Sequence, residues 1–213
     1  MSSLELAEEE VQVWVASLEV SDDRYSAFEG TLCPEERDRA GGLAPALARR
    51  FVVARGMLRG LLAGFTGTAA DTLRFRYGSS GKPSLSGHGI HFNISHSGDI
   101  GLFAFAPDRA VGVDVENQRP VRRMLDVAQR FMSEDEMRAL AATPPTERDA
   151  SFLKSWVVRE ARLKADGRGV WSGAKESNAV PALTHRIFAP RAGYIAAVAA
   201  SGSDWRLYTC AMT

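Results

Sequence analysis

The segment Gly112-Val113-Asp114-Val115-Glu116 carries two carboxylates two residues apart. On a strand, side chains alternate between faces, so Asp114 and Glu116 point the same way, with Cα atoms about 6–7 Å apart. Hard oxygen ligands of this kind suit Mg²⁺, which is commonly coordinated by protein carboxylates and substrate phosphates together. The alternative is a strand end whose charges face water. The pattern therefore indicates either a magnesium site or a solvated strand terminus.

A second pair, Glu160 and Lys164, lies four residues apart in a stretch of helical character. The two side chains would share one helix face, one turn apart and about 6 Å along the axis. An ordinary surface ion pair of this kind contributes roughly a few tenths of a kcal/mol. Alternatively, Glu160 completes the site of Asp114 and Glu116, while Lys164 neutralises a phosphate beside it. Spacing alone leaves both interpretations open.

Two further segments could meet an anion. In Phe92-Asn93-Ile94-Ser95-His96-Ser97-Gly98 a strand runs into a hydroxyl-rich turn, which either binds phosphate through Ser95, His96 and backbone N–H groups or is purely structural. Adjacent Ser and His do not form a catalytic pair, and no G-x-S-x-G elbow is present. In Gly81-Lys82-Pro83 a rigid bend could point the Lys82 ammonium into a cleft, but the segment lacks the glycine spacing of a P-loop.

The composition is that of an ordinary soluble globular protein, with 213 residues, 45% apolar, and 26 basic against 26 acidic residues. This balance argues against a protein that coats nucleic acid or an acidic membrane, so a polyanion must be met by a local cluster of cations. Two cysteines, Cys33 and Cys210, cannot form a disulfide framework. The apolar stretch 51–65 is interrupted by Arg55 and Arg59, so no bilayer span is expected, and the acidic start is unlike a signal peptide. We predict a cytoplasmic protein.

The expected elements alternate between short strands and longer helices. Period-2 patterns predict strands near 11–15, 73–77, 90–94, 100–106, 110–115, 186–188, 194–200 and 205–212. Helical spacing predicts helices near 35–40, 44–64, 133–142 and 148–166, the third opened by a Ser133/Glu136 capping box and the last closed by Gly167. Short turns between strands favour antiparallel pairing and an α+β fold. We expect two similar α+β halves, residues 1–117 and 118–213, related by a pseudo-twofold axis, each a long helix packed on a small, mainly antiparallel sheet.

Taken in order, five segments resemble the 4′-phosphopantetheinyl transferases of the surfactin-synthetase-activating (Sfp) type. They are G-K-P (81–83), F-N-I-S-H-S-G (92–98), G-V-D-V-E (112–116), F-M-S-E-D-E (131–136) and W-V-V-R-E-A-R-L-K-A-D-G-R-G (156–169). The resemblance implies coenzyme A in the cleft between two halves of a self-contained monomer. It also implies Mg²⁺-dependent transfer of the 4′-phosphopantetheine group to a serine of an acyl or peptidyl carrier protein, with release of 3′,5′-ADP. Carriers of fatty acid, polyketide and non-ribosomal peptide synthesis remain open.

The resemblance gives three carboxylates a common role, holding Mg²⁺ on the coenzyme A pyrophosphate: Asp114, Glu116 and Glu160. The ion would orient the pyrophosphate and stabilise charge on the leaving 3′,5′-ADP. Because the carrier serine attacks, no nucleophile on the enzyme is required. We take Glu160, directly or through a metal-bound water, as the group that accepts the serine proton.

Cations and hydrogen-bond donors would hold coenzyme A itself. By resemblance, Lys164 would contact the phosphates, and Ser95 and His96 would bind the 3′-phosphate end or a neighbouring phosphate. Lys82 would line the same pocket, and Arg55 resembles an arginine that family members use near the nucleotide.

One position departs from the family pattern, because Arg159 stands where a lysine usually precedes the glutamate. Arginine keeps the charge but donates hydrogen bonds differently. This substitution leaves open a catalytically impaired protein of the same fold that binds coenzyme A or a carrier. Independently of Arg159, the same carboxylates could serve a Mg²⁺-dependent phosphohydrolase that uses water as the nucleophile. For an acidic carrier, Arg119, Arg122 and Arg123 would form a basic rim, unless they are a solvated linker.

Overall fold

The computed structural model describes residues 4–78, 81–167 and 182–212. The helices are α1 (Asp22–Gly30), α2 (Pro34–Gly41), α3 (Pro45–Thr66), α4 (Met124–Phe131), α5 (Glu134–Ala142) and α6 (Arg148–Asp166). The strands are β1 (Glu10–Ser17), β2 (Phe75–Tyr77), β3 (Pro83–Leu85), β4 (Ile90–Ser97), β5 (Ile100–Pro107), β6 (Val111–Asn117), β7 (Leu183–Phe188), β8 (Tyr194–Ser201) and β9 (Arg206–Ala211).

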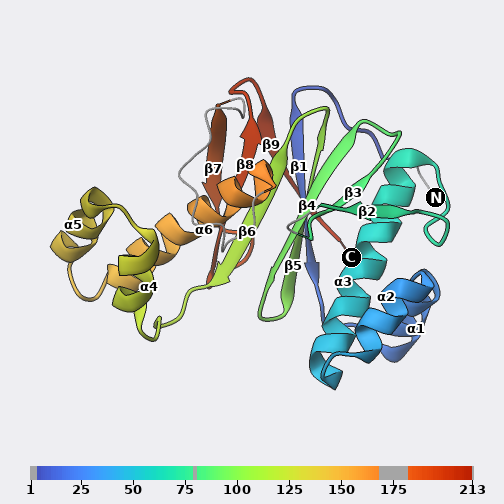
Figure 1. Cartoon of the computed structure of the whole chain (residues 1–213), viewed down its shortest axis with the longest axis horizontal. Coiled ribbons are helices and arrows are strands. Elements are labelled where there is room, and N and C mark those ends of the chain that lie inside the picture. The colour runs from blue at the N-terminus through green and yellow to red at the C-terminus, as the bar shows by residue number, and fades with distance from the viewer. Residues whose placement is uncertain (1–3, 79–80, 168–181, 213) are drawn as a thin grey trace.

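These elements form four layers, helix, sheet, sheet and helix (Figure 1). Of the two sheets that form these layers, the larger has the strand order β4-β5-β1-β9 and the smaller has the order β6-β8-β7, while β2 and β3 pair in a separate two-stranded hairpin. Helix α3 covers the outer face of the larger sheet, and α6 covers the outer face of the smaller one. Apart from the parallel pair of β1 and β9, the strands of both sheets pair antiparallel. The predicted α+β class with mainly antiparallel sheets is confirmed.

Strand pairing interlocks the two ends of the chain. β6 precedes residue 118 yet pairs with β8, and β9 follows it yet pairs with β1. Each sheet therefore takes a strand from either side of the predicted boundary, so a division into residues 1–117 and 118–213 does not follow the pairing. The pseudo-twofold relation between the halves stays a prediction.

The central core lies between the two sheets and is built by alternation along the strands. Leu102 and Ala104 of β5 face Val113 and Val115 of β6, and all four are at most 1% exposed. Because neighbouring side chains point to opposite faces, Asp114 of β6 turns away from this core and toward α6. Because the valines of β6 point into the core between the sheets, its acidic residues point to the opposite face of the strand.

Three elements were not predicted, α1, α4 and β3, and two of the misses have a clear cause. Helix α1 has no fully buried residue, and only Tyr25 and Phe28 pack against the core, which is too few apolar positions for periodicity to detect. Helix α4 starts after Arg123, which has a left-handed φ of 55° and no capping side chain, so the usual start signal is missing. The capping box at Ser133 and the end of α6 at Gly167 are confirmed.

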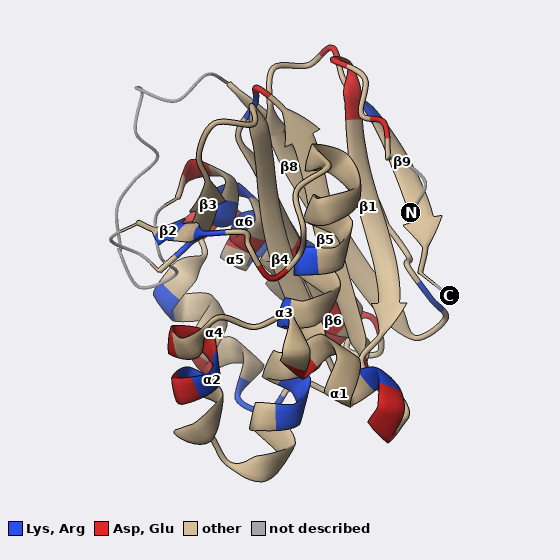
Figure 2. Cartoon of the chain, turned by 90° about the vertical axis from the view of Figure 1, so that its right-hand side faces the viewer, with Lys and Arg blue, Asp and Glu red and all other residues tan. Residues whose placement is uncertain are grey.

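Charged residues are concentrated outside the sheets. Figure 2 shows basic and acidic residues interspersed over α1 and α2, while the central strands carry few. Within the described ranges, none of the helices has the length and apolar character that crossing a bilayer would require.

Candidate active site

Helix α6 crosses β6 at Gly112 with almost no space between the two backbones. A Cβ atom at Gly112 would lie 2.1 Å from the carbonyl oxygen of Ala161 and 2.3 Å from the nitrogen of Ala165. The same two alanines pack against Ala197 and Ala199 of β8. Small residues on both surfaces therefore let the helix approach the sheet closely, which brings its polar side chains within reach of β6.

A direct ion pair at this crossing joins Lys164 of α6 to Asp114 of β6. Lys164 Nζ lies 2.6 Å from Asp114 Oδ1 and also donates to Ser95 Oγ at 3.1 Å and to the carbonyl oxygen of Val113 at 3.2 Å. Ser95 Oγ in turn donates to Asp114 Oδ1 at 2.9 Å. Three of the predicted site residues are thus brought together from β4, β6 and α6.

The charges of Asp114 and Lys164 change the pKa values of the two glutamates of the predicted site, Glu160 and Glu116. Burial raises the pKa of Glu160 to about 7, helped by the negative charges of Asp114 and, to a smaller extent, Glu116, against the opposing charges of Lys164 and Arg159. Burial and then Asp114 also raise the pKa of Glu116, although Ser97 Oγ donates to Glu116 Oε2 at 3.2 Å. Glu160 therefore lies within electrostatic range of Asp114, Glu116 and Lys164.

The arrangement has the chemistry of a magnesium site but is not a closed one. Within the described ranges, no group of three Asp, Glu, His or Cys side chains is gathered as a metal cage. Asp114 Oδ2 and Glu160 Oε1 are nevertheless buried and accept no hydrogen bond from the described part of the chain. Buried carboxylate oxygens without a protein donor can accept a water or an ion, and an all-oxygen set is what Mg²⁺ prefers. The residues present therefore fit the ion.

The 92–98 segment joins the edges of the two sheets. Asn93 Oδ1 accepts a hydrogen bond from the backbone nitrogen of Val113 at 2.9 Å, and Ser97 Oγ accepts one from the backbone nitrogen of Asn117 at 3.1 Å. Phe92, on the opposite face of β4, packs in the core under α3. Because side chains alternate along the strand, Phe92 packs in the core, whereas Asn93 and Ser97 bind the backbone of β6 on the same face as Ser95.

His96 lies beside two cations. Partial desolvation lowers the pKa of the exposed His96, and the positive charges of Lys164 and Arg50 lower it further. Arg50, near the start of α3, was not among the predicted site residues. Its only sequence signal is that it lies off the apolar stripe of that helix, which many surface arginines also do.

Two predicted coenzyme A contacts are engaged with protein groups. Lys82 Nζ donates to the carbonyl oxygens of Lys164 at 2.6 Å and Val111 at 2.9 Å. The buried Arg55 places Nε 3.5 Å from Glu36 Oε1, and its guanidinium lies 5.1–6.0 Å from the centroids of three aromatic rings. That these two residues contact coenzyme A stays a prediction.

The departure at Arg159 and the predicted basic rim can also be located. The Arg159 guanidinium lies 5.8 Å from the centroid of the Phe131 ring. The positive charge of Arg119 acts on Glu116 and opposes the rise in its pKa, so Arg119 is near the site. Arg123 pairs with Asp126 at 2.6 Å. Residues 168–169, which end the fifth motif, lie outside the described residues.

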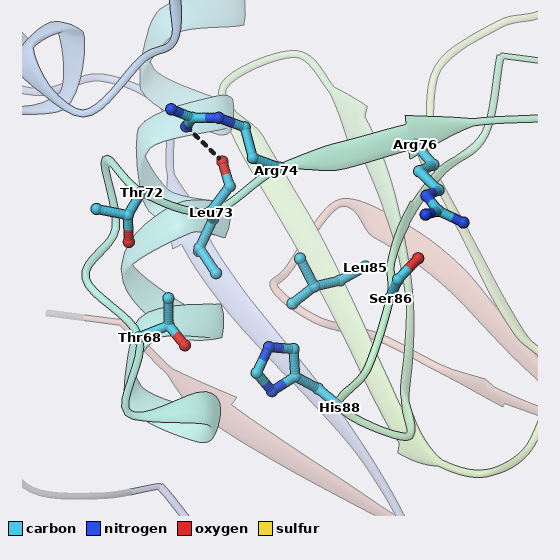
Figure 3. A pocket seen from close by; sticks show the side chains of 8 residues that line it. All are labelled: Thr68, Thr72, Leu73, Arg74, Arg76, Leu85, Ser86 and His88. Atoms are coloured by element: carbon cyan, nitrogen blue, oxygen red, sulfur yellow. Dashed lines mark hydrogen bonds between the residues drawn. The ribbon is translucent and has the colours of Figure 1, made fainter.

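A cavity of about 300 Å³ lies apart from this site, between the end of α3 and the β2–β3 hairpin (Figure 3). Its lining consists of Thr68, Thr72, Leu73, Arg74, Arg76, Leu85, Ser86 and His88. Arg74 Nη1 donates to the carbonyl oxygen of Leu73 at 3.2 Å. None of the predicted site residues lines this cavity.

Comparisons with known proteins give the chain a family. A family model described as the 4′-phosphopantetheinyl transferase superfamily matches residues 110–209, which include β6 and α6. The 4′-phosphopantetheinyl transferase HetI of Nostoc sp. is 32% identical over 221 residues, 96% of this chain and 93% of its own. Sfp of Bacillus subtilis is 28% identical, over 71% of this chain and 67% of its own. This chain therefore belongs to the 4′-phosphopantetheinyl transferase superfamily.

Proposed function

We propose that this protein transfers the 4′-phosphopantetheine group from coenzyme A to a serine of an acyl or peptidyl carrier protein and releases 3′,5′-ADP. The observation that carries the proposal is the contact between Asp114 and Lys164, close to Glu160, whose carboxyl group has a raised pKa. That meeting lies in the region matched by the family model. Relatives that are similar to this chain are named 4′-phosphopantetheinyl transferases.

Asp114, Glu116 and Glu160 would hold Mg²⁺. Support comes from the buried oxygens of Asp114 and Glu160 that have no donor in the described chain, and from the mutual repulsion of the three carboxylates. When bound, the ion supplies positive charge to the pyrophosphate and to the leaving 3′,5′-ADP.

The chain's own cations and donors would bind the rest of coenzyme A. The Lys164 side chain is 25% exposed, so its ammonium can meet a phosphate oxygen while it stays near Asp114. Ser95 and His96 lie on the same strand, and the charge of Arg50 reaches His96. Together these groups place positive charge and hydrogen-bond donors at one edge of an otherwise neutral protein, as binding of a polyanion requires.

Glu160 is the residue that would accept the proton of the attacking serine. A general base works best when its pKa lies near the operating pH, and burial beside Asp114 raises the pKa of Glu160 toward that range. The protein would orient the hydroxyl and receive its proton at a Glu160 carboxylate oxygen, while 3′,5′-ADP departs. No nucleophile on the enzyme takes part.

The carrier protein would approach past Arg119, Arg122 and Arg123, between β6 and α4. Arg119 lies near Glu116, so an acidic carrier bound to this rim would hold its serine close to the carboxylates. It stays a prediction that the protein is a monomer, that it is located in the cytoplasm and that it does not bind nucleic acid.

Intact-protein mass spectrometry tests the transfer directly. An apo carrier protein incubated with coenzyme A, Mg²⁺ and this protein is expected to gain the mass of one phosphopantetheine group. Asp114→Ala and Glu160→Ala are each expected to lower the rate at least 100-fold while the protein stays folded by circular dichroism. The exposed Glu147 provides the matched control, and Glu147→Ala should transfer at the normal rate.

Other results would favour a different function. Tight binding of coenzyme A in calorimetry with no turnover on several carriers would indicate an impaired binding protein. Release of 3′,5′-ADP in the absence of any carrier would indicate a phosphohydrolase. A near-normal rate of either alanine variant at saturating Mg²⁺ would refute the proposed metal ligands.

A further inference from the structure

Lys82 lies against the C-terminal turn of α6, 82 residues away from it in the sequence. Its Nζ donates to the carbonyl oxygens of Lys164 at 2.6 Å, Val111 at 2.9 Å and Ala165 at 3.5 Å. An ammonium group has three N–H donors and no acceptor. The three carbonyls therefore account for the hydrogen-bonding capacity of the Lys82 side chain.

Two of these carbonyls belong to a helix end that cannot satisfy them itself. Helix α6 ends at Asp166, and the last four carbonyl groups of an α-helix lack an intrahelical partner. They also carry the negative end of the helix dipole, where a cation is favourable. Gly167, with a left-handed φ of 75°, returns its N–H to the Lys164 carbonyl at 3.3 Å. Lys82 adds a charged donor to this cap.

The third carbonyl, that of Val111, belongs to the first residue of β6. It directly precedes Gly112, where the backbones of β6 and α6 touch. Lys82 thus bridges the helix and the strand beside their point of closest approach. Gly112 allows the two backbones to meet, and Lys82 holds the helix end against the strand.

We propose that Lys82 is a positioning residue, which ties the C-terminal turn of α6 to the start of β6 and thereby holds the Lys164 ammonium over Asp114. Lys164 takes part at both ends of this arrangement, because its carbonyl accepts from Lys82 while its Nζ donates to Asp114. Glu160 lies one turn earlier on the same helix. The inference rests on the proposed transferase function and adds to it a role in placing the site.

A positioning role and a direct contact with coenzyme A have different kinetic consequences. Removing a side chain that binds substrate and transition state equally raises KM and leaves kcat unchanged. Displacing Lys164 and Glu160 weakens interactions needed in the transition state and lowers kcat. Because the donors of Lys82 face backbone carbonyls, the second pattern is expected.

Lys82→Met is the first test variant, since methionine keeps an unbranched side chain but has no ammonium. We expect kcat to fall 10- to 100-fold and KM for coenzyme A to change less than threefold, at a temperature where circular dichroism shows the variant folded. Lys82→Arg, which can still donate to carbonyls, is expected to recover at least part of kcat. The exposed Lys154 on the same helix provides the control, and Lys154→Met should match the wild type.

Amide hydrogen exchange provides a second readout that does not depend on catalysis. Loss of the tether should make the amides of residues 164–167 exchange at least tenfold faster in Lys82→Met, while those of residues 153–157 stay unchanged. If Lys82→Met does not fold, both measurements apply to Lys82→Arg, in which a smaller change of the same kind is expected.

Several results would overturn the inference. A KM increase above tenfold with an unchanged kcat would make Lys82 a coenzyme A contact. Unchanged exchange at residues 164–167 would show that the tether does not hold the helix end. If the wild type transfers nothing to any carrier, the proposed function fails, and the exchange measurement still decides whether Lys82 anchors α6.

Discussion

The two long helices meet their sheets in different ways. Helix α3 rests on large side chains, with Leu58 and Leu62 at 0% exposure against Phe103 and Phe105 of β5. Helix α6 rests on alanines and lies backbone to backbone with β6 at Gly112. Large buried side chains remove much apolar area from water, at about 25 cal/mol per Å², and keep the helix away from the sheet. Small side chains remove less but bring polar groups on the helix within reach of the strand.

Buried charges occur in both regions but in different groupings. Under α3, the fully buried Arg59 pairs with Glu36 at 2.8 Å and donates to the carbonyl oxygens of Ala70 and Leu73, while Glu36 Oε1 and Arg59 Nη2 have no hydrogen-bond partner in the described chain. Under α6, Asp114 Oδ2 and Glu160 Oε1 have no donor in the described chain. The unpartnered atoms under α3 thus belong to an ion pair of opposite charges, whereas those under α6 belong to two carboxylates, and the charge of Asp114 helps to raise the pKa of Glu160.

Gly112→Ala should have the largest effect, because its Cβ would lie 2.1 Å from the carbonyl oxygen of Ala161 and neither backbone can move aside easily. We expect a loss of at least about 4 kcal/mol in the free energy of unfolding, or failure to fold, since overpacking against rigid backbone is at the severe end of single substitutions. Any folded fraction should transfer poorly, because α6 would be displaced from β6. Urea denaturation together with the carrier assay measures both. A stable and active variant would show that the close approach is not required.

Leu58→Ala should affect stability without affecting chemistry. Removing this fully buried side chain leaves a cavity under α3, and such substitutions cost about 2–5 kcal/mol. Because Leu58 lies on the opposite side of the larger sheet from α6, kcat measured well below the melting temperature should stay within twofold of the wild type. A matching loss of kcat would indicate that the two helix–sheet regions are coupled.

The strand and the helix that carry the site residues could be predicted from the sequence, but the contact between them could not. Period-2 alternation places Asp114 and Glu116 on one face of a strand, and helical spacing places Glu160 above Lys164. Gly112 could have indicated that a backbone passes close to β6, because glycine inside a strand often marks such an approach, but the close approach was not predicted. The sequence does not say which backbone it is, since that depends on how α6 packs on the smaller sheet.

Other features depend on contacts that no local pattern encodes. The pairing of β9 with β1 joins residues almost 200 positions apart. The charge of Arg50 acts on His96 only because the tertiary structure places the start of α3 near β4. The ammonium of Lys82 lies against carbonyls of α6 and β6 that only the tertiary structure places there, and its predicted contact with coenzyme A stays a prediction.

Glu160 should make stability depend on pH in the metal-free protein. Its folded-state pKa, raised from 4.5 to about 7, means that between these values the folded state holds a proton that the unfolded state has released. Stability should therefore fall as the pH rises from about 5 to 7.5, by roughly 1–3 kcal/mol. Glu160→Gln, which cannot ionise, should lack this part of the decrease. Urea denaturation in chelator at both pH values gives the comparison, and identical profiles for the two proteins would contradict the raised pKa.

Gly60→Ala should give the smallest effect and the opposite sign to Gly112→Ala. Gly60 lies inside α3, and a Cβ atom there would have no other atom within 4 Å beyond its own helix neighbourhood. Alanine restricts the unfolded chain and favours the helix, so we expect a gain of about 0.5–1 kcal/mol in the free energy of unfolding with no change in kcat. The same glycine-to-alanine change would then stabilise the helix that stands away from its sheet and destabilise the contact where helix and strand touch. If Gly60→Ala were destabilising, α3 would have to be packed more tightly than its open position shows, and the contrast between the two helices would be lost.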